Sequence, residues 1–561
     1  MKRLSIRRLG RGRYLLAALA GLLLAAAFPT FNLAGFAWVA PGLMLAAAAG
    51  RPGGPAFRLG YVAGLVDSLA SLHWLLFIPF PLGAAAGWLA LSAYLALYPG
   101  VWVWCCWHLY PHPGATVDLT TEDSLAGVEP ARSIMALGWS RRVLWAALCA
   151  ATWVALEMAV GRFLTGFPWN FLGVSQYLVL PLIQLASVTG VYGVSFLVVW
   201  VSVAAGCAVA AAVGRPASRW DWVGELAVPL LVTFAVVWFG LDRLARTAPS
   251  GRTLRIALVQ PSIPQTLIWD EKENATRFRQ ILQLSEQALA TRPDLLVWPE
   301  AALPEFSEDN FRALTNLVAA HRAWMVFGAD DAEPSPRKAG GDLELFYNAA
   351  FLLDPTGHLA AVYHKQRLVI FGEYVPLARQ LPFLKSFTPI QGEFAEGNGP
   401  VQFRLTRPEA QCSVLICFED TFAVLAREAA APGTDFLLNL TNDGWFGESA
   451  EQWQHAVNAA FRAVETGRPL VRCTNNGLSC WIDACGRLHG IYFPGDRNIY
   501  RPGVKTARIP LRGRAERGGL TFYGRHGDWF GWGCVGWVAV TCAARFPLRK
   551  TLGNSPSRTL E

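Results

Sequence analysis

The sequence predicts a polytopic α-helical membrane protein with an inserted α/β domain, and three observations lead to this fold class. Apolar residues make up 53% of the 561 residues and charged residues only 16%, a composition more apolar than that of ordinary soluble proteins. Many of the apolar residues gather in blocks of about 20, the length that crosses a bilayer. The segment 247–527 instead alternates strand-like and helix-like patterns. We therefore expect a membrane domain over 1–246, the inserted domain over 247–527, and a last span with its tail over 528–561.

Eight apolar blocks are long enough to be membrane spans of about 30 Å. Because a helix satisfies its own backbone hydrogen bonds in lipid, we expect each block to be helical. The blocks run roughly over 13–30, 34–50, 59–80, 84–110, 142–160, 178–212, 225–245 and 528–546.

Basic residues at the two ends of the chain predict its orientation. The stretch before the first span carries Lys2, Arg3 and four more arginines with no acid, and the tail carries Arg545, Arg549, Lys550 and Arg558. Positive residues favour the cytoplasmic side, so both termini should be cytoplasmic. An even number of spans satisfies this condition. Seven spans then precede the inserted domain, which places it in the periplasm of a Gram-negative cell.

Two other interpretations of the basic residues are weaker. The basic start could be a cleavable signal peptide with a site at Ala25 to Ala27, but a retained first helix is simpler because more spans follow. The formal charge of +8 could indicate nucleic-acid binding. The excess basic residues lie largely at termini and loops, so membrane topology and contact with anionic lipids explain them better, and we expect no nucleic-acid partner.

The eleven cysteines do not predict a disulfide framework. Those in or beside the spans are expected to be small buried hydrophobic residues. Five belong to the inserted domain, so at least one stays unpaired or pairs outside it, and we expect that one to be Cys417. No Cys/His spacing typical of zinc occurs, so we expect no metal. The first group is Cys105, Cys106, Cys149, Cys207, Cys534 and Cys542, and the second is Cys412, Cys417, Cys473, Cys480 and Cys485.

Hydrophobic periodicity divides the inserted domain into strands and helices. The strands are near-continuously apolar, as in 435–439, which is typical of sheets covered on both faces by helices or by another sheet. Strands are expected over 254–260, 294–300, 323–329, 347–354, 359–365, 413–418, 435–441, 469–475 and 478–483, and helices over 270–290, 307–322, 421–431 and 450–466.

Three reactive side chains lie at the ends of three strand-like runs. Glu300, Lys365 and Cys417 close the runs 294–300, 359–365 and 413–418 or lie next to their ends. A thiol needs a base to become a thiolate, and an acyl-transfer intermediate needs a positive donor near its oxyanion. Glu and Lys can supply these two roles, so we expect one active site.

The same three residues carry a resemblance to a known family. Glu300 in VWPE, Lys365 in YHK and Cys417 in ICFE resemble the Glu-Lys-Cys set of the nitrilase superfamily. Further motifs make nearly the whole chain similar to the bacterial apolipoprotein N-acyltransferases. These motifs are VQPSIPQTLIWD at 259–270, FGEYVPL at 371–377, NDGWFG at 442–447, WQH at 453–455, GRPL at 467–470 and TNNG at 474–477.

The resemblance implies a fold, a location and a reaction. It implies a nitrilase-like α-β-β-α sandwich between the last two of eight spans, in the bacterial inner membrane. Cys417 would take an acyl chain from a phospholipid, such as phosphatidylethanolamine, as a thioester. It would then pass the chain to the N-terminal amine of diacylated apolipoproteins. No cofactor is implied, and we expect a monomer in contact with membrane lipids.

The resemblance also assigns roles to individual residues. Glu300 would be the general base, and Lys365 with the backbone N–H of Phe418 would hold the oxyanion. A helix over 421–431 would favour the Cys417 thiolate through its dipole. Supporting and substrate-binding roles would fall to Glu373, Glu419, Trp269 and Trp445.

Two features depart from the family pattern. Phe418 stands where the family commonly has Tyr, which removes a phenol hydroxyl but leaves the backbone N–H. The polar stretch 111–139 is longer than a simple turn, and we assign it no function.

Each site residue also has an ordinary structural interpretation. A cysteine flanked by apolar residues is most often a core residue, and charged strand-end residues are usually solvated. The matching contexts of Glu300, Lys365 and Cys417 favour catalysis instead. Two alternatives remain: a membrane-tethered amidase that passes the acyl group to water, and a transporter or scaffold with an inactive domain. Transport would need charges within the spans, where Asp67 and Glu157 are among very few candidates.

Both expected substrates come from the outer leaflet. We therefore expect the inserted domain to sit over the membrane with an opening at lipid level. Mobile loops around Trp269, 371–376 and Trp445 would admit the two substrates.

Overall fold

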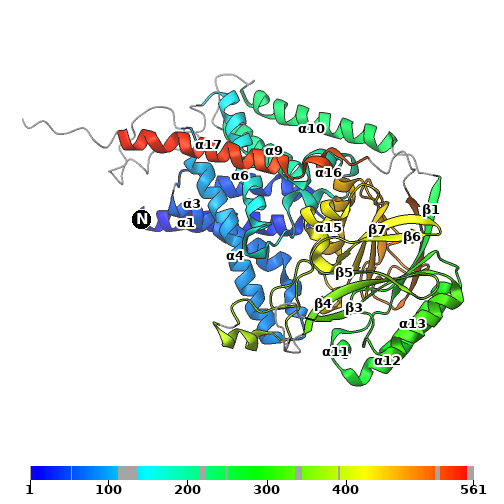
Figure 1. Ribbon diagram of the computed structural model, residues 1–561. Helices are drawn as coiled ribbons and strands as arrows, with labels where there is room; N and C mark the ends of the chain where they lie inside the picture. Colours follow the sequence, from blue (N-terminus) through cyan, green and yellow to red (C-terminus); the bar gives the residue numbers. More distant parts are fainter. Residues whose placement is uncertain are drawn as a thin grey trace, which may run out of the picture.

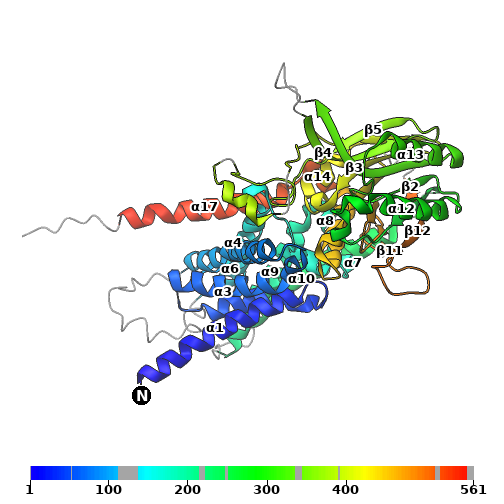
Figure 2. The same cartoon turned by 90° about the horizontal axis from the view of Figure 1, so that it is seen from below.

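The chain forms a helical bundle and an α/β domain that lies beyond one end of the bundle (Figures 1 and 2). The predicted stretch 111–139 falls almost wholly outside the described residues. The computed structural model describes residues 2–51, 53–111, 137–213, 221–246, 251–334, 344–378, 380–388, 392–511 and 519–551.

Four helices among the described residues are long and apolar enough to cross a membrane, so the chain is a multi-pass membrane protein. They are α4 (Pro81–His108), α6 (Trp139–Val160), α9 (Val191–Val213) and α10 (Asp221–Arg246). Three further helices run along the same bundle (Figures 1 and 2), namely α1 (Lys2–Ala26), α3 (Gly54–Ser71) and α17 (Trp529–Thr551).

Three of the expected spans are not continuous helices. The block 59–80 contains the end of α3 and a separate 3₁₀ turn, η2 (His73–Phe77). The block 34–50 forms a 3₁₀ turn, η1 (Ala34–Trp38), and the eight-residue helix α2 (Ala40–Ala47). Eight helical residues extend only about 12 Å. Pro41 lies in the first turn of α2, where proline suits a helix start rather than a helix interior.

The block 178–212 is broken in a similar way. Two short helices, α7 (Leu180–Ile183) and α8 (Ala186–Thr189), precede α9, and Gly190 follows α8 with φ of +68°. That left-handed conformation favours glycine and ends the helix. Hydropathy marks the apolar length correctly but does not reveal these breaks.

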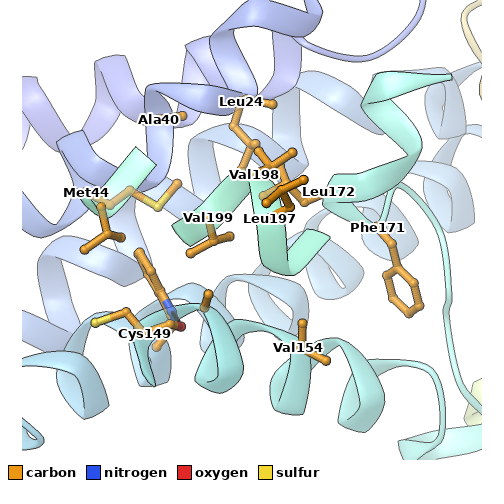
Figure 3. Packing of buried hydrophobic residues seen from close by; sticks show 14 of the residues in the cluster. Leu24, Ala40, Met44, Cys149, Val154, Phe171, Leu172, Leu197, Val198 and Val199 are labelled. Atoms are coloured by element: carbon orange, nitrogen blue, oxygen red, sulfur yellow. Dashed lines mark hydrogen bonds between the residues drawn. The ribbon is translucent and has the colours of Figure 1, made fainter. Parts of the chain in front are cut away.

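Small residues let the bundle helices approach one another closely. A Cβ atom at Gly60 of α3 would lie 2.4 Å from the carbonyl oxygen of Pro99 in α4, so only glycine fits this contact. In the bundle core, Leu24 and Met44 lie near Leu197, Val198 and Val199 of α9 (Figure 3).

The α/β domain contains two six-stranded sheets with the same pattern of directions. In each sheet, three parallel strands are flanked by antiparallel strands. The first sheet has the order β12 (Gly503–Leu511), β1 (Arg252–Gln260), β2 (Leu295–Val297), β3 (Trp324–Pro334), β4 (Glu344–Leu353) and β5 (Leu359–His364). The second has the order β11 (Leu488–His489), β10 (Cys480–Ile482), β9 (Leu470–Thr474), β8 (Phe436–Thr441), β7 (Glu409–Ile416) and β6 (Gln402–Thr406).

The two sheets pack face to face, and helices cover their outer faces. Ile256 and Val297 of one sheet share a buried cluster with Val414 and Leu438 of the other. Helices α12 (Asn274–Leu289) and α13 (Glu308–His321) cover the first sheet, and α14 (Ala423–Ala429) and α15 (Glu451–Thr466) cover the second. The layers therefore run helix, sheet, sheet, helix, as expected.

Helix α15 is buried on all sides except at Trp453. One side lies on the second sheet, and Val457, Phe461 and Val464 on another side join the core of the membrane domain. The α/β domain and the bundle therefore share this helix as a common element.

All nine expected strands are present, with ends shifted by a few residues. The expected helix 421–431 is shorter: a 3₁₀ segment, η7 (Cys417–Thr421), precedes α14. Strands β6, β11 and β12 were not predicted. Charged residues and a proline interrupt the apolar pattern of β12, and β11 has only two residues.

Candidate active site

The three predicted catalytic residues follow three different strands and meet where the two sheets face each other. Lys365 directly follows β5, Cys417 directly follows β7, and Glu300 lies just beyond β2. The approach of Glu300 to β3 depends on Gly328, where a Cβ atom would lie 2.7 Å from the Cα atom of Glu300.

Glu300 is buried and uses both carboxylate oxygens. Its Oε1 accepts hydrogen bonds from Asn348 Nδ2 at 2.8 Å and from Lys365 Nζ at 3.2 Å. Its Oε2 accepts from the backbone N–H of Asn442 at 2.9 Å. The carboxylate is thus fixed by donors from three separate segments.

Lys365 is 1% exposed and lies between two carboxylates. Its Nζ donates to Glu373 Oε1 at 2.8 Å as well as to Glu300. Burial on its own would lower the pKa of Lys365, but Glu300 and Glu373 raise it well above the ordinary value. The amine is therefore a fixed cation. Glu373 is held in turn by Asn348 Nδ2 and the N–H of Val369, each at 2.8 Å.

Cys417 is half-buried and has φ of +55°, a left-handed conformation that is uncommon for a non-glycine residue. Its carbonyl oxygen accepts a hydrogen bond from Asn439 Nδ2 at 2.8 Å. Burial, together with the Glu300 carboxylate, raises the pKa of the thiol well above its ordinary value, and Lys365 opposes this shift.

The resting thiol is therefore neutral. This differs from the expected thiolate, because α14 begins only at Ala423 and burial dominates. A neutral thiol needs a base at the moment of attack, and Glu300 is the nearby carboxylate that can serve.

Glu419 connects the Lys365 segment to the Cys417 segment. Its Oε1 accepts from the N–H groups of Gln366 at 2.7 Å and Arg367 at 3.0 Å. Its Oε2 accepts from the N–H of Ile416 at 2.7 Å and the hydroxyl of Tyr363 at 2.8 Å. All four contacts are to the protein itself, so Glu419 acts as a support of the site.

The three aromatic candidates lie at the edge of the site. The Phe418 ring lies 5.8 Å from Lys365 Nζ and packs against a cluster that includes Leu72 and Trp169 of the membrane domain. Trp269 is 41% exposed, and its ring centroid is 5.2 Å from that of Trp445.

Several supporting residues were not predicted from the sequence. Asn348 links Glu300 to Glu373, Asn439 holds the Cys417 carbonyl, and Asn442 donates to Glu300. A polar residue inside an apolar strand, as in FLLNL for Asn439, was a usable signal. His455 was missed for another reason: it lies on α15 and reaches the site only through the fold.

One buried group has residue types that can bind metals, namely Asp443, Glu451 and His455. Both ring nitrogens of His455 face carboxylates, of Asp443 at 2.9 Å and of Asp420 at 2.8 Å. Arg472 pairs with Asp420 and Asp443 as well. Positive charge is thus already supplied by the protein, and we assign no metal here.

A cavity of about 110 Å³ lies in the membrane domain beneath the α/β domain. Trp169 and Asn170 line it, and both also donate to Gln454 of α15. The buried Glu157 lines it too, and its Oε1 accepts three hydrogen bonds, from Trp153, Leu172 and Ser195. Glu157 therefore connects α6 to Leu172 and to Ser195 of α9.

Comparisons with known proteins agree with this arrangement. A family model described as the apolipoprotein N-acyltransferase N-terminal domain matches residues 20–204, and one described as carbon-nitrogen hydrolase matches residues 255–506. The apolipoprotein N-acyltransferase of Geobacter metallireducens is 33% identical over 543 residues, which cover 96% of this chain and 96% of that protein. That of Caulobacter vibrioides is 32% identical and covers 91% of each.

A solved amidase of the nitrilase superfamily from Nesterenkonia is 20% identical, with a TM-score of 0.34, and covers 50% of this chain and 95% of that one. Because the Geobacter protein matches almost end to end, the chain belongs to the apolipoprotein N-acyltransferase family.

Proposed function

We propose that Cys417 carries the acyl chain as a thioester during a two-step transfer. In the first step, Glu300 takes the thiol proton and the thiolate attacks an ester carbonyl of a phospholipid. Lys365 and the backbone N–H of Phe418 stabilise the oxyanion. The intermediate collapses, and the leaving lysophospholipid oxygen takes the proton from Glu300.

In the second step, the N-terminal amine of a diacylated apolipoprotein attacks the thioester. Glu300 accepts a proton from that amine, the C–S bond breaks, and the Cys417 thiolate recovers the proton. The products are an amide on the lipoprotein and the free enzyme. Membership of the family makes the chain an acyltransferase of lipoprotein maturation, and the apolipoprotein acceptor follows from the name of its relatives. The phospholipid donor is the part of the proposal that the family resemblance implies.

One observation carries the assignment of the site. Lys365 forms ion pairs with both Glu300 and Glu373. Beside this cluster, burial and the charge of Glu300 raise the pKa of the Cys417 thiol, and the charge of Lys365 lowers it. A base, a fixed cation and a neutral thiol thus share one buried cluster beside the membrane domain.

We also propose that the chain crosses the bacterial inner membrane eight times, with the domain boundaries at about 247 and 527. Gln454 of α15 donates to the carbonyl oxygens of Pro29 and Ser71, which supports α1 and α3 both running toward the catalytic domain. The segment that connects α1 to α3 must then run back toward the opposite side of the membrane. Arg13, about midway along α1, donates to the carbonyl oxygen of Ala47 at the end of α2, so the connecting segment does run back along α1.

Contacts at the helix ends that lie away from the α/β domain also support eight membrane spans. Arg545 of α17 donates to the carbonyl oxygens of His108, the last residue of α4, and of Tyr110 just beyond it. Arg142 near the start of α6 pairs with Glu225 near the start of α10. Both chain termini would then be cytoplasmic and the catalytic domain periplasmic.

The reaction can be tested on the full chain in nanodiscs that contain phosphatidylethanolamine. We expect an acyl mass on Cys417 that hydroxylamine removes and that moves to the amine of a diacylated lipopeptide. Cys417→Ala should lose the adduct, whereas Cys412→Ala, which removes another buried thiol of β7, should keep it.

Other outcomes would assign a different function. An adduct that passes only to water would indicate a tethered amidase. The lack of any adduct on Cys417 with phosphatidylethanolamine, phosphatidylglycerol or cardiolipin would contradict the proposed chemistry.

A further inference from the structure

The first turn of α15 carries two neighbouring buried side chains, Gln454 and His455, that contact different domains. The Gln454 amide makes five hydrogen bonds, and every one goes to the membrane domain. Its Oε1 accepts from Trp74 at 3.0 Å, Trp169 at 2.9 Å and Asn170 at 3.3 Å, and its Nε2 donates to the carbonyl oxygens of Pro29 at 2.9 Å and Ser71 at 3.1 Å.

His455 instead contacts the catalytic centre. Its Nδ1 lies 2.9 Å from Asp443 Oδ1, and its Nε2 lies 2.8 Å from Asp420 Oδ1 and 3.3 Å from the carbonyl oxygen of Cys417. Ionised carboxylates only accept hydrogen bonds, so both ring nitrogens must carry hydrogen. Burial alone would lower the pKa of His455, but Asp420 and Asp443 raise it to about 10 against the opposing charge of Arg472.

The groups held by His455 are those that set the reacting atoms in place. Asp420 lies in η7, the segment that begins with the left-handed Cys417. Asp443 follows Asn442, whose N–H donates to Glu300. One imidazolium therefore connects the nucleophile segment to the segment that fixes the base.

The membrane domain contacts both members of the pair through one residue. The Trp169 ring lies 5.4 Å from the His455 ring, while its indole N–H donates to Gln454. The position of α15 on the membrane domain and the position of His455 against Cys417 thus depend on each other.

We propose that His455 is a positioning residue for acyl transfer, and that Gln454 makes its position depend on the seating of the catalytic domain on the membrane domain. This inference rests on the proposed role of Cys417. Neither side chain is assigned a contact with substrate, and both act through Cys417 and Glu300.

The test uses substitutions that keep one donor at a time. His455→Asn keeps a donor near the Nδ1 position and loses the donor toward Asp420 and Cys417, whereas His455→Gln keeps a donor near the Nε2 position. Gln454→Met keeps the length of the side chain and removes its polar atoms. Thr466→Val, at the far end of α15, controls for changes in helix packing, because Thr466 is buried and bonds only within the helix.

Two readouts separate positioning from loss of folded protein. Single-turnover acylation with phosphatidylethanolamine in nanodiscs gives an amplitude, which counts active sites, and a rate constant per active site. Alkylation of Cys417 by iodoacetamide across pH gives a midpoint that does not depend on the lipid substrate.

We expect His455→Asn and Gln454→Met to lower the acylation rate constant about tenfold, the equivalent of about one hydrogen bond to a charged group. His455→Gln should recover part of that loss. The lipid concentration for half-maximal rate should stay unchanged, and Thr466→Val should match wild type.

The alkylation midpoint should rise in both His455 variants. Asp420 and Asp443 then face the thiol segment with Arg472 as their remaining cation, and added negative charge disfavours a thiolate. Burial and Asp443 raise the pKa of the neighbouring Glu451 well above its ordinary value, so Glu451 adds no charge. In Gln454→Met, which keeps the imidazolium, the midpoint should not move.

Rate constants within twofold of wild type in His455→Asn, with the same alkylation midpoint, would overturn the role of His455. A normal rate constant in Gln454→Met would overturn the dependence on domain seating. If wild type forms no thioester, the proposed function fails, and the alkylation data alone decide the role of His455.

Discussion

The ion pair between Lys365 and Glu373 is the contact whose loss should be most costly in the site. Glu373→Gln keeps the shape of the side chain and removes one negative charge 2.8 Å from Lys365 Nζ. At an effective dielectric constant of about 20, that pair corresponds to about 6 kcal/mol of Coulomb energy. Loss of one partner of a buried pair is measured at about 3–5 kcal/mol. Lys365 keeps Glu300 at 3.2 Å, so we expect the lower end, about 3 kcal/mol.

The assay is thermal unfolding of the purified full chain in detergent. At about 2–4 °C per kcal/mol for a domain of this size, the midpoint should fall by about 6–12 °C. Glu308→Gln is the matched control, because Glu308 pairs with Arg312 on the surface, where the side chains are 85% and 61% exposed. Such pairs contribute between 0 and about 1 kcal/mol.

A second background tests the electrostatic reason directly. In Lys365→Met, Glu300 and Glu373 are left as two buried carboxylates that share the donor Asn348. Glu373→Gln in that background removes their repulsion, so its effect should change sign and raise the midpoint. If Glu373→Gln costs no more than Glu308→Gln, or destabilises equally in both backgrounds, the reasoning is refuted.

Three further predictions concern the surroundings of the site. The carboxylates around His455 raise its folded-state pKa to about 10. The stabilisation of the folded state by the charged imidazole is therefore complete below about pH 6.5 and is lost as the pH rises. The free energy of unfolding should fall by about 2–3 kcal/mol between pH 6.5 and 8.5. Denaturant titrations at both pH values should show this slope in wild type and a smaller one in His455→Gln; equal slopes would contradict it. Phe418→Tyr should change the acylation rate less than about fivefold, since one hydrogen bond is worth about 1 kcal/mol and the backbone N–H is kept; a larger gain in single-turnover assays would give the phenol a role. Tyr363→Phe should lower the free energy of unfolding by about 1–3 kcal/mol, because Glu419 loses a buried donor, and an unchanged denaturation midpoint would rule this out.

Much of the fold could be predicted from the sequence, because apolar blocks and strand periodicity report burial directly. The breaks within the membrane segments could not. At Gly190 and Pro41 a single residue ends or restarts a helix inside an apolar block, and a hydropathy window averages over it. The strand β12 was missed because Lys505, Arg508 and Pro510 interrupt its apolar pattern.

The sequence could single out the three candidate residues because each has its own local context, whereas it could not single out the residues that hold them. Glu300, Lys365 and Cys417 lie at strand ends with distinctive neighbours. His455 meets the Cys417 carbonyl from 38 residues away in sequence, and it owes its charge to Asp420 and Asp443. The motif WQH at 453–455 marks His455 in the sequence, but its role depends on contacts that form only after folding.

The position of α17 has a consequence for how the protein is made. This helix follows the entire α/β domain in the chain, yet it packs against α6, where Gly531 leaves room for Met158. Asp528, just before α17, pairs with Arg162 beyond the end of α6. Until α17 is made, the side of α6 that it covers therefore stays open while the preceding α/β domain is synthesised. Insertion of α17 is the step that covers this side of α6.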